Sequence, residues 1–292
     1  MLQDFETYLR QEKRYSTHTC LAYLHDIAQF SAYHQCERLS DWQEQNAATV
    51  RSWMVYLIDS GISNRSVNRK LASLRTFFKW LQKEEKIKVT PMSRVQGPKS
   101  EKRLPVFVKE QELQENRTQP LFADNFEGLR SRLIIELFYQ TGIRLSELID
   151  LKDNAVSSQS IKVLGKRNKE RVIPISQDLF LLIVRFRRMK LAMKLDHPYL
   201  FVRENNEPLY PQFVYRLVKS VLSTISAVEK QSPHVLRHTF ATHMLNNGAG
   251  LETLKDLLGH ANLSATQVYT HNSFAQLKQA YQTAHPRAVK TR

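Results

Sequence analysis

The sequence predicts a mainly α-helical protein of two domains, the second of which also contains a small antiparallel sheet. Three observations predict this fold class. Apolar residues recur at helical spacing through most of the chain, one pair of short segments alternates as strands do, and a charged segment with glycine and proline divides the chain. A length of 292 residues fits two domains of ordinary size.

The first part of the chain is predicted to form four short helices with no strand between them. Apolar residues keep helical spacing over residues 5–10, 17–30, 47–58 and 64–81. Ser16 or Thr17 can cap the second helix, Gly61 ends the third, and Ser63 or Asn64 can cap the fourth. We therefore expect a four-helix bundle over residues 1–96. The segment GPKSEKRLP, residues 97–105, is predicted to be a linker.

The remaining residues, 106–292, are predicted to form a mostly helical domain. Strands are expected at 160–164 and 171–175, joined by a polar turn, and together they indicate a β-hairpin. Helices are expected at 127–140, 145–151, 177–194, 211–226, 234–246, 251–258 and 264–282.

The composition excludes several classes of protein. Apolar residues are 42% and charged residues 24% of the chain, as in ordinary globular proteins, so a disordered or fibrous chain is excluded. No run approaches the ~20 apolar residues that span a bilayer, and the first ten residues lack the pattern of a signal peptide. Two cysteines, Cys20 and Cys36, cannot form a disulfide framework. We expect a cytoplasmic protein.

The net charge predicts a polyanionic partner. Forty-three Lys and Arg residues against 28 Asp and Glu give a net charge of +15. A solvated basic surface would also explain this excess, but so strong a charge favours association with nucleic acid first and with an anionic membrane surface second. Charge alone does not distinguish binding from catalysis.

Four blocks in the second domain concentrate polar residues. Arg144 and Glu147 lie in TGIRLSEL (141–148), and Lys166 lies in the hairpin turn GKRNKER (165–171). His234 and Arg237 share a helix face in SPHVLRHTFATHML (232–245), and His260 and Tyr269 lie in LLGHANLSATQVYTH (257–271).

Each block alone also fits an ordinary structural role. Arg144 could pair with Glu147 or Glu136, the hairpin turn could simply be solvated, and Tyr269 could be a packed core residue. A metal site at His234 and His238 is disfavoured, because no Glu follows His234 and Arg237 on the same face would repel a cation.

Together the blocks are specific. Their order, Arg, Lys, His-x-x-Arg, His, Tyr, resembles that of the tyrosine recombinases (phage integrase family), and within them the Xer site-specific recombinases. The resemblance covers the helical first domain, the GPK linker, the four blocks and the HPRA sequence at 285–288. It implies a SAM-like core-binding domain joined to a catalytic domain, the two forming a C-shaped clamp on DNA.

The resemblance also implies the chemistry. Tyr269 is expected to be the nucleophile, forming a 3′-phosphotyrosyl intermediate, while Arg144 and Arg237 bind the scissile phosphate. Lys166 is expected to be the general acid, His234 the base, and His260 a hydrogen-bond donor. Glu147 would orient Arg144 or a neighbouring basic group. Arg167 stands where relatives often have a second glycine, and at this departure it is expected to stiffen the loop or touch a phosphate. No cofactor, metal or ATP is expected.

The resemblance implies that the second and fourth helices of the first domain enter adjacent major grooves of DNA, and specific contacts are predicted on the fourth. The residues predicted for this face are Asn68, Arg69, Lys70, Ser73 and Arg75. The resemblance further implies a homo- or hetero-tetramer on a double-stranded recombination site, formed alone or with a paralogous recombinase. It also implies a DNA translocase as a candidate activator, and a C-terminal segment, 274–288, that docks in a neighbouring protomer.

The expected role is resolution of chromosome or plasmid dimers at cell division, in a nucleoid-associated enzyme. The compact form, with no additional N-terminal arm-binding domain, favours it over an integrase or resolvase of a mobile element. Two further classes of protein are a type IB topoisomerase and a DNA-binding protein on an inactive recombinase scaffold. The full set of pocket residues disfavours the inactive scaffold, and the first domain and HPRA sequence disfavour the topoisomerase.

Overall fold

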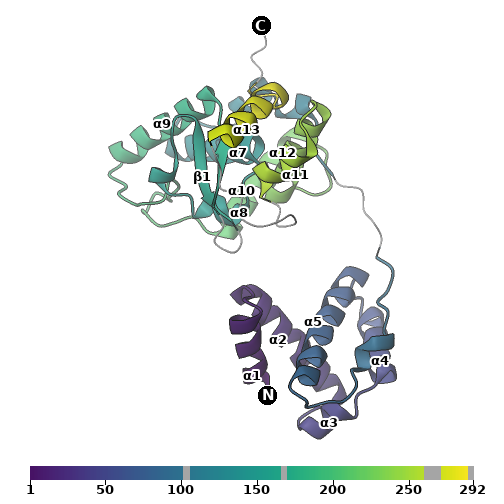
Figure 1. Cartoon of the computed structure of the whole chain (residues 1–292). Coiled ribbons are helices and arrows are strands. Elements are labelled where there is room, and N and C mark those ends of the chain that lie inside the picture. Colours follow the sequence, from purple (N-terminus) through teal and green to yellow (C-terminus); the bar gives the residue numbers. More distant parts are fainter. Residues whose placement is uncertain (101–105, 166–169, 260–270, 289–292) are drawn as a thin grey trace. The chain divides into compact units, whose positions relative to one another are not determined.

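Two compact units make up the chain (Figure 1). The computed structural model describes residues 1–100, 106–165, 170–259 and 271–288. The units are Met1–Arg103 and Leu104–Arg292, so the division falls inside the segment 97–105 that was predicted to be a linker. Each unit has its own core of buried apolar side chains.

The N-terminal unit is built from helices packed around aromatic side chains. Its elements are α1 (Leu2–Thr7), the π-helix η1 (Tyr8–Glu12), α2 (Thr17–His34), α3 (Leu39–Gln43), α4 (Ala47–Asp59), α5 (Asn64–Lys83) and the 3₁₀-helix η2 (Pro91–Arg94). Ser16 and Ser63 cap α2 and α5, each accepting a hydrogen bond from a backbone N–H three residues later. The short helix α3 was not predicted.

The C-terminal unit is mostly helical with one antiparallel hairpin. Its helices are η3 (Glu110–Leu113), α6 (Glu115–Thr118), η4 (Gln119–Leu121), α7 (Phe126–Thr141), α8 (Leu145–Ile149), η5 (Asp153–Ala155), α9 (Gln177–Ala192), α10 (Pro211–Ile225), α11 (Pro233–Asn246), α12 (Leu251–Leu258) and α13 (His271–Ala284). The strands β1 (Ser160–Leu164) and β2 (Glu170–Pro174) pair from Ser160 with Pro174 to Leu164 with Glu170. The predicted fold class is confirmed.

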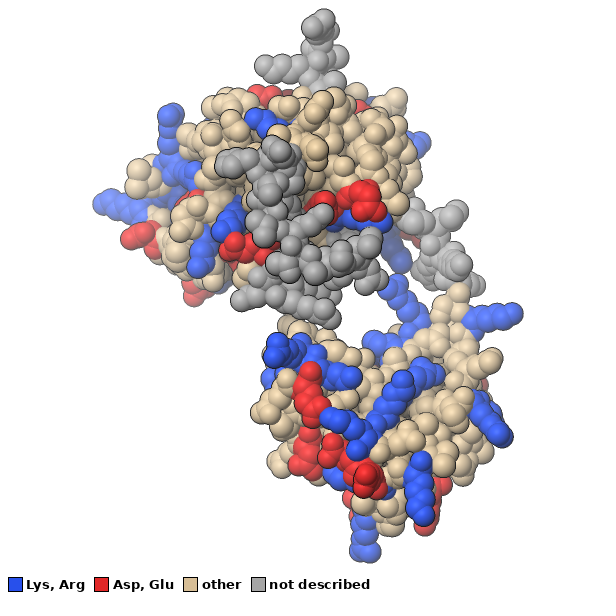
Figure 2. All heavy atoms as spheres, in the orientation of Figure 1, with Lys and Arg blue, Asp and Glu red and all other residues tan. Residues whose placement is uncertain are grey.

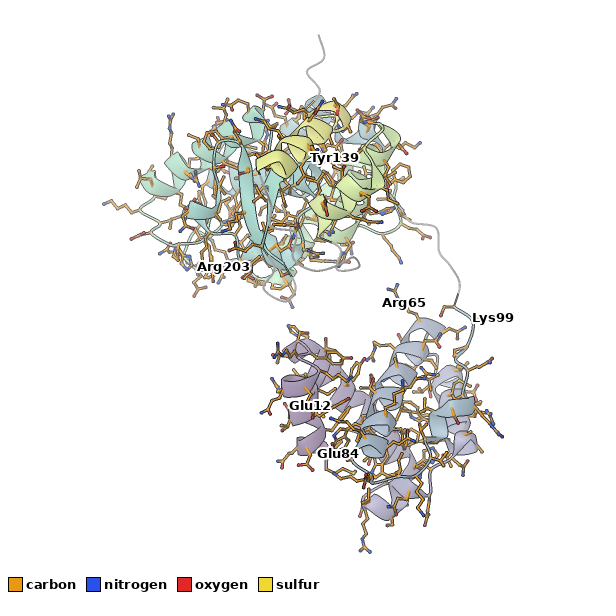
Figure 3. All side chains as sticks on the ribbon, viewed as in Figure 1. Glu12, Arg65, Glu84, Lys99, Tyr139 and Arg203 are labelled. Atoms are coloured by element: carbon orange, nitrogen blue, oxygen red, sulfur yellow. The ribbon has the colours of Figure 1, made fainter. Side chains whose placement is uncertain are left out.

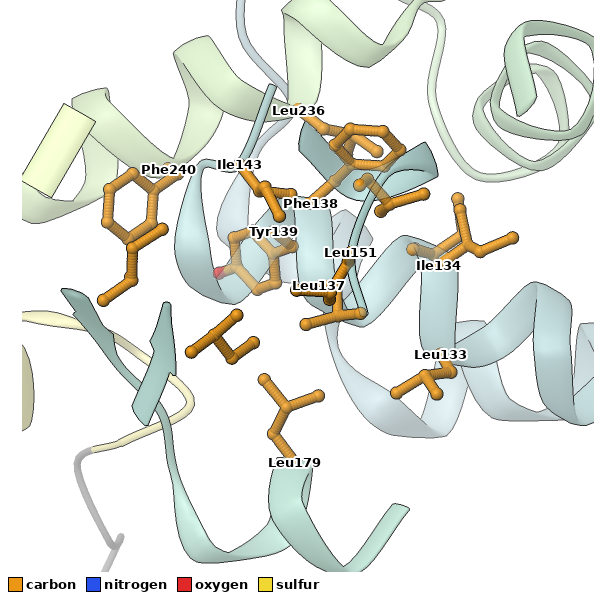
Figure 4. Packing of buried hydrophobic residues seen from close by; sticks show 14 of the residues in the cluster. Leu133, Ile134, Leu137, Phe138, Tyr139, Ile143, Leu151, Leu179, Leu236 and Phe240 are labelled. Atoms are coloured by element: carbon orange, nitrogen blue, oxygen red, sulfur yellow. The ribbon is translucent and has the colours of Figure 1, made fainter. Parts of the chain in front are cut away.

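Helix α7 is the centre of the C-terminal core. Its side chains are buried on nearly every face, because α9 and α11 pack against it and α13 covers part of its length. Tyr139 lies among Leu137, Phe138, Ile143 and Phe240 (Figure 4). This packing fixes the carboxyl end of α7, from which the first polar block of the sequence begins.

The C-terminal segment packs on its own domain. Leu277, Tyr281 and Ala284 of α13 are buried, and His285 is fully buried beside Tyr139. The segment expected to dock in a neighbouring protomer is therefore seated within the chain that carries it, and any exchange must expose these side chains. Among the described helices, none combines the length and apolar character needed to cross a membrane.

Candidate active site

Arg144 is placed by the turn that ends α7. Gly142 has φ +58°, and a Cβ there would lie 2.5 Å from Phe240 Cδ1, so only glycine fits. The chain then enters α8, where Arg144 is the N-cap residue. Its backbone N–H donates to Glu147 Oε2 (2.9 Å) and its Nη1 donates to Glu147 Oε1 (2.7 Å). Glu147 thus holds both the backbone and the side chain of Arg144.

Arg171 holds Glu147 from the other side. This arginine lies on β2 and its side chain is only 3% exposed. Its Nη1 and Nη2 donate to the two oxygens of Glu147 at 2.6 and 2.7 Å, a bidentate arrangement. Arg171 was not among the predicted site residues. Strand alternation could have identified it, since it shares the buried face of the hairpin with Ile173.

Arg237 is anchored by the carboxyl ends of two helices. It lies on α11, where Nη1 donates to the carbonyl of Gly142 and Nη2 donates to the carbonyl of Leu258 at 2.6 Å. Burial, together with the charges of Arg144 and Arg171, lowers the pKa of Arg237 to about 9. A pKa of about 9 still leaves the guanidinium protonated at pH 7.

The three guanidiniums meet at the carboxyl end of α12. Arg171 Nε donates to Leu257 O (2.9 Å), Arg237 to Leu258 O, and Arg144 Nη2 to Gly259 O (2.8 Å). A helix carboxyl end carries partial negative charge, which favours cations there. Arg144 and Arg237, which lie far apart in the sequence, are therefore brought together.

The histidines of the third block lie on the same helix as Arg237. His234 is exposed in the first turn of α11, three residues before Arg237 and on the same face. His238 is partly buried, and this burial lowers its pKa. Within the described residues, no group of three or more His, Cys, Asp or Glu side chains could hold a metal ion.

Four predicted site residues lie outside the described residues. These are Lys166 and Arg167 of the hairpin turn, and His260 and Tyr269 of the last block. His260 is the residue that follows Gly259 in the sequence. Arg144 and Arg171 bond the buried Glu147 carboxylate, and their charges also act on the neighbouring Arg237. Three guanidiniums with one carboxylate leave an excess of positive charge, which favours an anion.

The two domains match two family models. Residues 2–85 match "Phage integrase, N-terminal SAM-like domain", and residues 111–276 match "Phage integrase family". The chain therefore belongs to the phage integrase family of tyrosine recombinases. As a member of this family, the recombinase is an enzyme of site-specific DNA recombination.

Curated relatives of the recombinase match it over nearly their whole length. Tyrosine recombinase XerC of Staphylococcus carnosus (strain TM300) is 38% identical, with 99% of this chain and 98% of the relative covered. Tyrosine recombinase XerC of Bacillus subtilis (strain 168) is 35% identical, with 98% and 96% covered. The predicted similarity to Xer recombinases is confirmed.

Solved structures share the recombinase's fold. The XerH site-specific recombinase bound to palindromic difH substrate, a post-cleavage complex, superposes with a TM-score of 0.73 at 20% identity, covering 96% of this chain and 84% of that one. The Tn1549 transposon integrase in complex with circular intermediate DNA gives a TM-score of 0.65 at 18% identity, covering 94% and 97%.

The residues predicted to contact DNA from α5 have mixed surroundings. Asp26 of α2 is fully buried and accepts hydrogen bonds from Arg69, Lys70 (3.1 Å) and Ser73 (2.7 Å). Ser73 is fully buried and Lys70 is 6% exposed. These two residues are therefore removed from the predicted DNA face. Both side chains bond the buried carboxylate of Asp26, which needs hydrogen-bond partners, and these bonds join α5 to α2.

The other three predicted contacts reach the surface to differing degrees. Arg69 has a side chain that is 47% exposed. Asn68 donates to Pro98 O (2.8 Å), and Arg75 Nη2 donates to Val95 O (3.3 Å), so both help to hold the chain that follows α5. Exposed Arg65, at the start of α5, extends outward from the helix (Figure 3) and is not one of the five contacts predicted for this helix.

Proposed function

We propose that the recombinase cleaves and rejoins DNA strands through a covalent bond between Tyr269 and a 3′-phosphate. The observation that carries this proposal is the convergence of Arg144 and Arg237 on the carbonyls of Gly259 and Leu258, at the start of the block that also contains His260 and Tyr269. A phosphoryl transition state spreads negative charge over its equatorial oxygens, and two guanidiniums offer fixed forks of donors to it.

Each proton in the reaction has a proposed carrier. The Tyr269 oxygen attacks phosphorus while His234 takes its proton, because a phenol with a pKa near 10 needs a base at pH 7. The bond from phosphorus to the 5′ oxygen breaks, and Lys166 gives that oxygen a proton. His260 donates a hydrogen bond to a non-bridging oxygen, and Arg167 contacts a neighbouring phosphate.

Rejoining reverses these steps on a partner strand. The 5′-hydroxyl of the partner attacks the phosphotyrosine, the proton returns to Tyr269, and the strand is sealed. The covalent bond conserves the energy of the original phosphodiester, so the reaction consumes no ATP. The protein's own cations supply the stabilising charge, so we propose that no metal takes part.

We further propose that the partner is a double-stranded recombination site bound by four protomers, alone or with a paralogous recombinase, in the cytoplasm. Resolution of chromosome or plasmid dimers is the role that the XerC relatives favour, since they match over nearly the full chain. A DNA translocase is proposed as the activator. Mapping binding sites on the genome tests the role, and a single peak near the replication terminus is expected.

The chemistry is tested with Tyr269→Phe. The mapped site is placed in a duplex nicked near the cleavage point, so that the cleaved strand escapes and the covalent complex accumulates. We expect the native protein and Tyr215→Phe, a control at an exposed tyrosine, to form the adduct. The Tyr269→Phe protein should bind the same duplex with unchanged affinity and form none. An adduct with this variant would move the nucleophile to another residue.

A further inference from the structure

Arg171 is a buried arginine whose three nitrogens all have partners. Nη1 and Nη2 donate to the Glu147 carboxylate, and Nε donates to the carbonyl of Leu257 at 2.9 Å. The guanidinium is planar and rigid, so these bonds fix Glu147 and Leu257 relative to each other. One side chain thereby joins β2, α8 and the end of α12.

A buried ion pair such as that of Arg171 and Glu147 usually adds little to the free energy of unfolding. Taking two charges out of water is costly, and well-packed apolar residues of similar size often stabilise a protein as much or more. Arg171 lies on the strand face that also carries Ile173, which is fully buried, so an apolar residue would suit the position. What only an arginine provides there is the geometry of its bonds.

The bonds of Arg171 lead to both sides of the site. On one side, Glu147 Oε1 also accepts from Arg144 Nη1 (2.7 Å). On the other side, Gly259 packs against the Arg171 side chain, because a Cβ at Gly259 would lie 3.0 Å from Arg171 Cδ. Gly259 has φ +63° and directly precedes His260 in the sequence.

We propose that Arg171 is a positioning residue for recombination, holding Arg144 through Glu147 and holding the end of α12 through Leu257 and Gly259. The proposal rests on the proposed function, in which Arg144 binds the scissile phosphate and the block after α12 carries the nucleophile. Because one side chain holds both, a small displacement of Arg171 shifts Arg144 and the end of α12 together.

The test compares Arg171→Lys with Arg130→Lys. Lysine keeps the positive charge at 171 but replaces three directed donors by one ammonium group. Arg130 is a matched control: it is 2% exposed, lies on α7 in the same domain, and bonds Val202 O (3.1 Å) and Glu127 rather than the site. Both variants lose a buried guanidinium, and only one loses contact with Glu147.

Two measurements are made on the full-length protein. The first is single-turnover formation of the covalent adduct on the nicked duplex over a range of DNA concentrations. For Arg171→Lys we expect the maximal rate to fall about 10- to 100-fold, as for other residues that orient a reacting group. The DNA concentration at half-maximal rate should change less than about 3-fold, because phosphate contacts elsewhere dominate affinity. Arg130→Lys should keep the native maximal rate at temperatures where it is folded.

The second measurement is hydrogen exchange of the backbone amides in α8 and α12. Faster exchange in both helices is expected for Arg171→Lys and not for Arg130→Lys. A native maximal rate for Arg171→Lys, or an equal loss in both variants, would overturn the proposal. If the native protein forms no adduct that depends on Tyr269, the proposed function fails. In that case hydrogen exchange alone tests the positioning role, and unchanged exchange in α8 and α12 of Arg171→Lys rejects it.

Discussion

Glu147 is a buried carboxylate whose ionisation holds the described part of the site together. Burial alone would raise its pKa, but the hydrogen bonds and charge of Arg171, with the hydrogen bonds of Arg144, lower the pKa to about 2. The folded protein therefore favours the carboxylate more strongly than the unfolded chain does. This stabilisation is complete above the ordinary pKa of about 4.5 and is lost as the pH falls toward 2.

We predict that Glu147→Gln destabilises the C-terminal unit in a pH-dependent way. At pH 7 the variant should be about 3 kcal/mol less stable, because two guanidiniums lose their counter-charge. At pH 3 the difference in stability should be roughly 2 kcal/mol smaller. At that pH the unfolded chain is already protonated at Glu147, so the low pKa of the folded carboxylate stabilises the protein less. Urea unfolding followed by circular dichroism at the two pH values measures both differences.

The chain offers two controls for this measurement. Glu127→Gln removes a carboxylate that is 58% exposed, and its effect should stay below about 1 kcal/mol at both pH values. The three tryptophans, Trp42, Trp53 and Trp80, all lie in the N-terminal unit, so their fluorescence transition should not move in either variant. A destabilisation of equal size at pH 7 and pH 3 would show that ionisation of Glu147 is not its cause.

The sequence predicted which side chains have suitable chemistry for a site, but it did not predict which of them are buried. Arg144 and Arg237 could be predicted from their motifs, and the structure brings them together. Lys70 and Ser73 were predicted to contact DNA because the resemblance places the fourth helix in a DNA groove, although both side chains bond the buried Asp26 of α2. That contact joins residues 44 and 47 positions apart, and helical spacing within one segment cannot show it.

At the scale of elements, α13 and the residues after it are fastened to α7 by a neutral histidine. His285 Nε2 donates to Tyr139 O (3.1 Å), while His285 Nδ1 accepts from the backbone N–H of Arg287 (3.1 Å). This pattern fixes the uncharged tautomer. Burial, with smaller contributions from His243 and Arg287, lowers the pKa of His285 to about 3.

We predict that mild acid loosens this segment. Below pH 6.5 a histidine released from the core takes up a proton, whereas buried His285 does not until about pH 3. At pH 5 the population of the open form should therefore be up to about 25-fold larger than at pH 7. Hydrogen exchange of residues 274–288, corrected for intrinsic rates, should accelerate accordingly in the native protein.

His285→Gln is the informative variant. Glutamine can offer a donor to Tyr139 O and an acceptor to the Arg287 N–H, but it does not titrate. Hydrogen exchange of residues 274–288 in His285→Gln should not accelerate between pH 7 and pH 5. The control His25→Gln, at an exposed position on α2, should show the same acceleration as the native protein. Equal pH dependence in His285→Gln and the native protein would mean that another group controls the segment.

Elements with a clear apolar period were the predictable ones. The helix expected at 251–258 and the strand expected at 160–164 have the observed bounds, because apolar spacing extends over their whole length. The five-residue helix α3 and the short helices of residues 110–121 were missed, since so few residues show no period. Capping of α3 depends on the Asp41 carboxylate, which accepts from the backbone N–H groups of Glu37 (2.8 Å) and Arg38 (2.6 Å).

At the scale of the whole molecule, the net charge of +15 concerns association and not fold. On the face of the N-terminal unit seen in Figure 2, Lys and Arg side chains are spread out with acidic side chains among them. Part of the positive charge is internal, as for Lys70 and Arg171. The exposed remainder is what a DNA backbone can use, so the charged residues have to be sorted by exposure before they are assigned to binding.

We predict that DNA binding by the full chain depends steeply on salt. If one protomer neutralises about ten phosphates, the slope of log K against log salt concentration should be roughly −9. Arg65→Ala, which removes an exposed cation at the start of α5, should reduce the magnitude of that slope by about one. Fluorescence anisotropy of a labelled duplex between about 50 and 200 mM salt measures the slopes.

The variant Lys70→Met tests whether the Lys70 ammonium group contacts DNA or only stabilises the N-terminal unit. Its ammonium group is bonded to Asp26 inside the unit, so the substitution leaves that carboxylate with one ionic partner fewer and should destabilise the N-terminal unit by about 3 kcal/mol. Tryptophan fluorescence reports this loss directly. In the folded variant the salt slope should equal that of the native protein. A slope reduced as much as that of Arg65→Ala would return Lys70 to the DNA-binding face, since released counterions are counted only for cations that reach a phosphate.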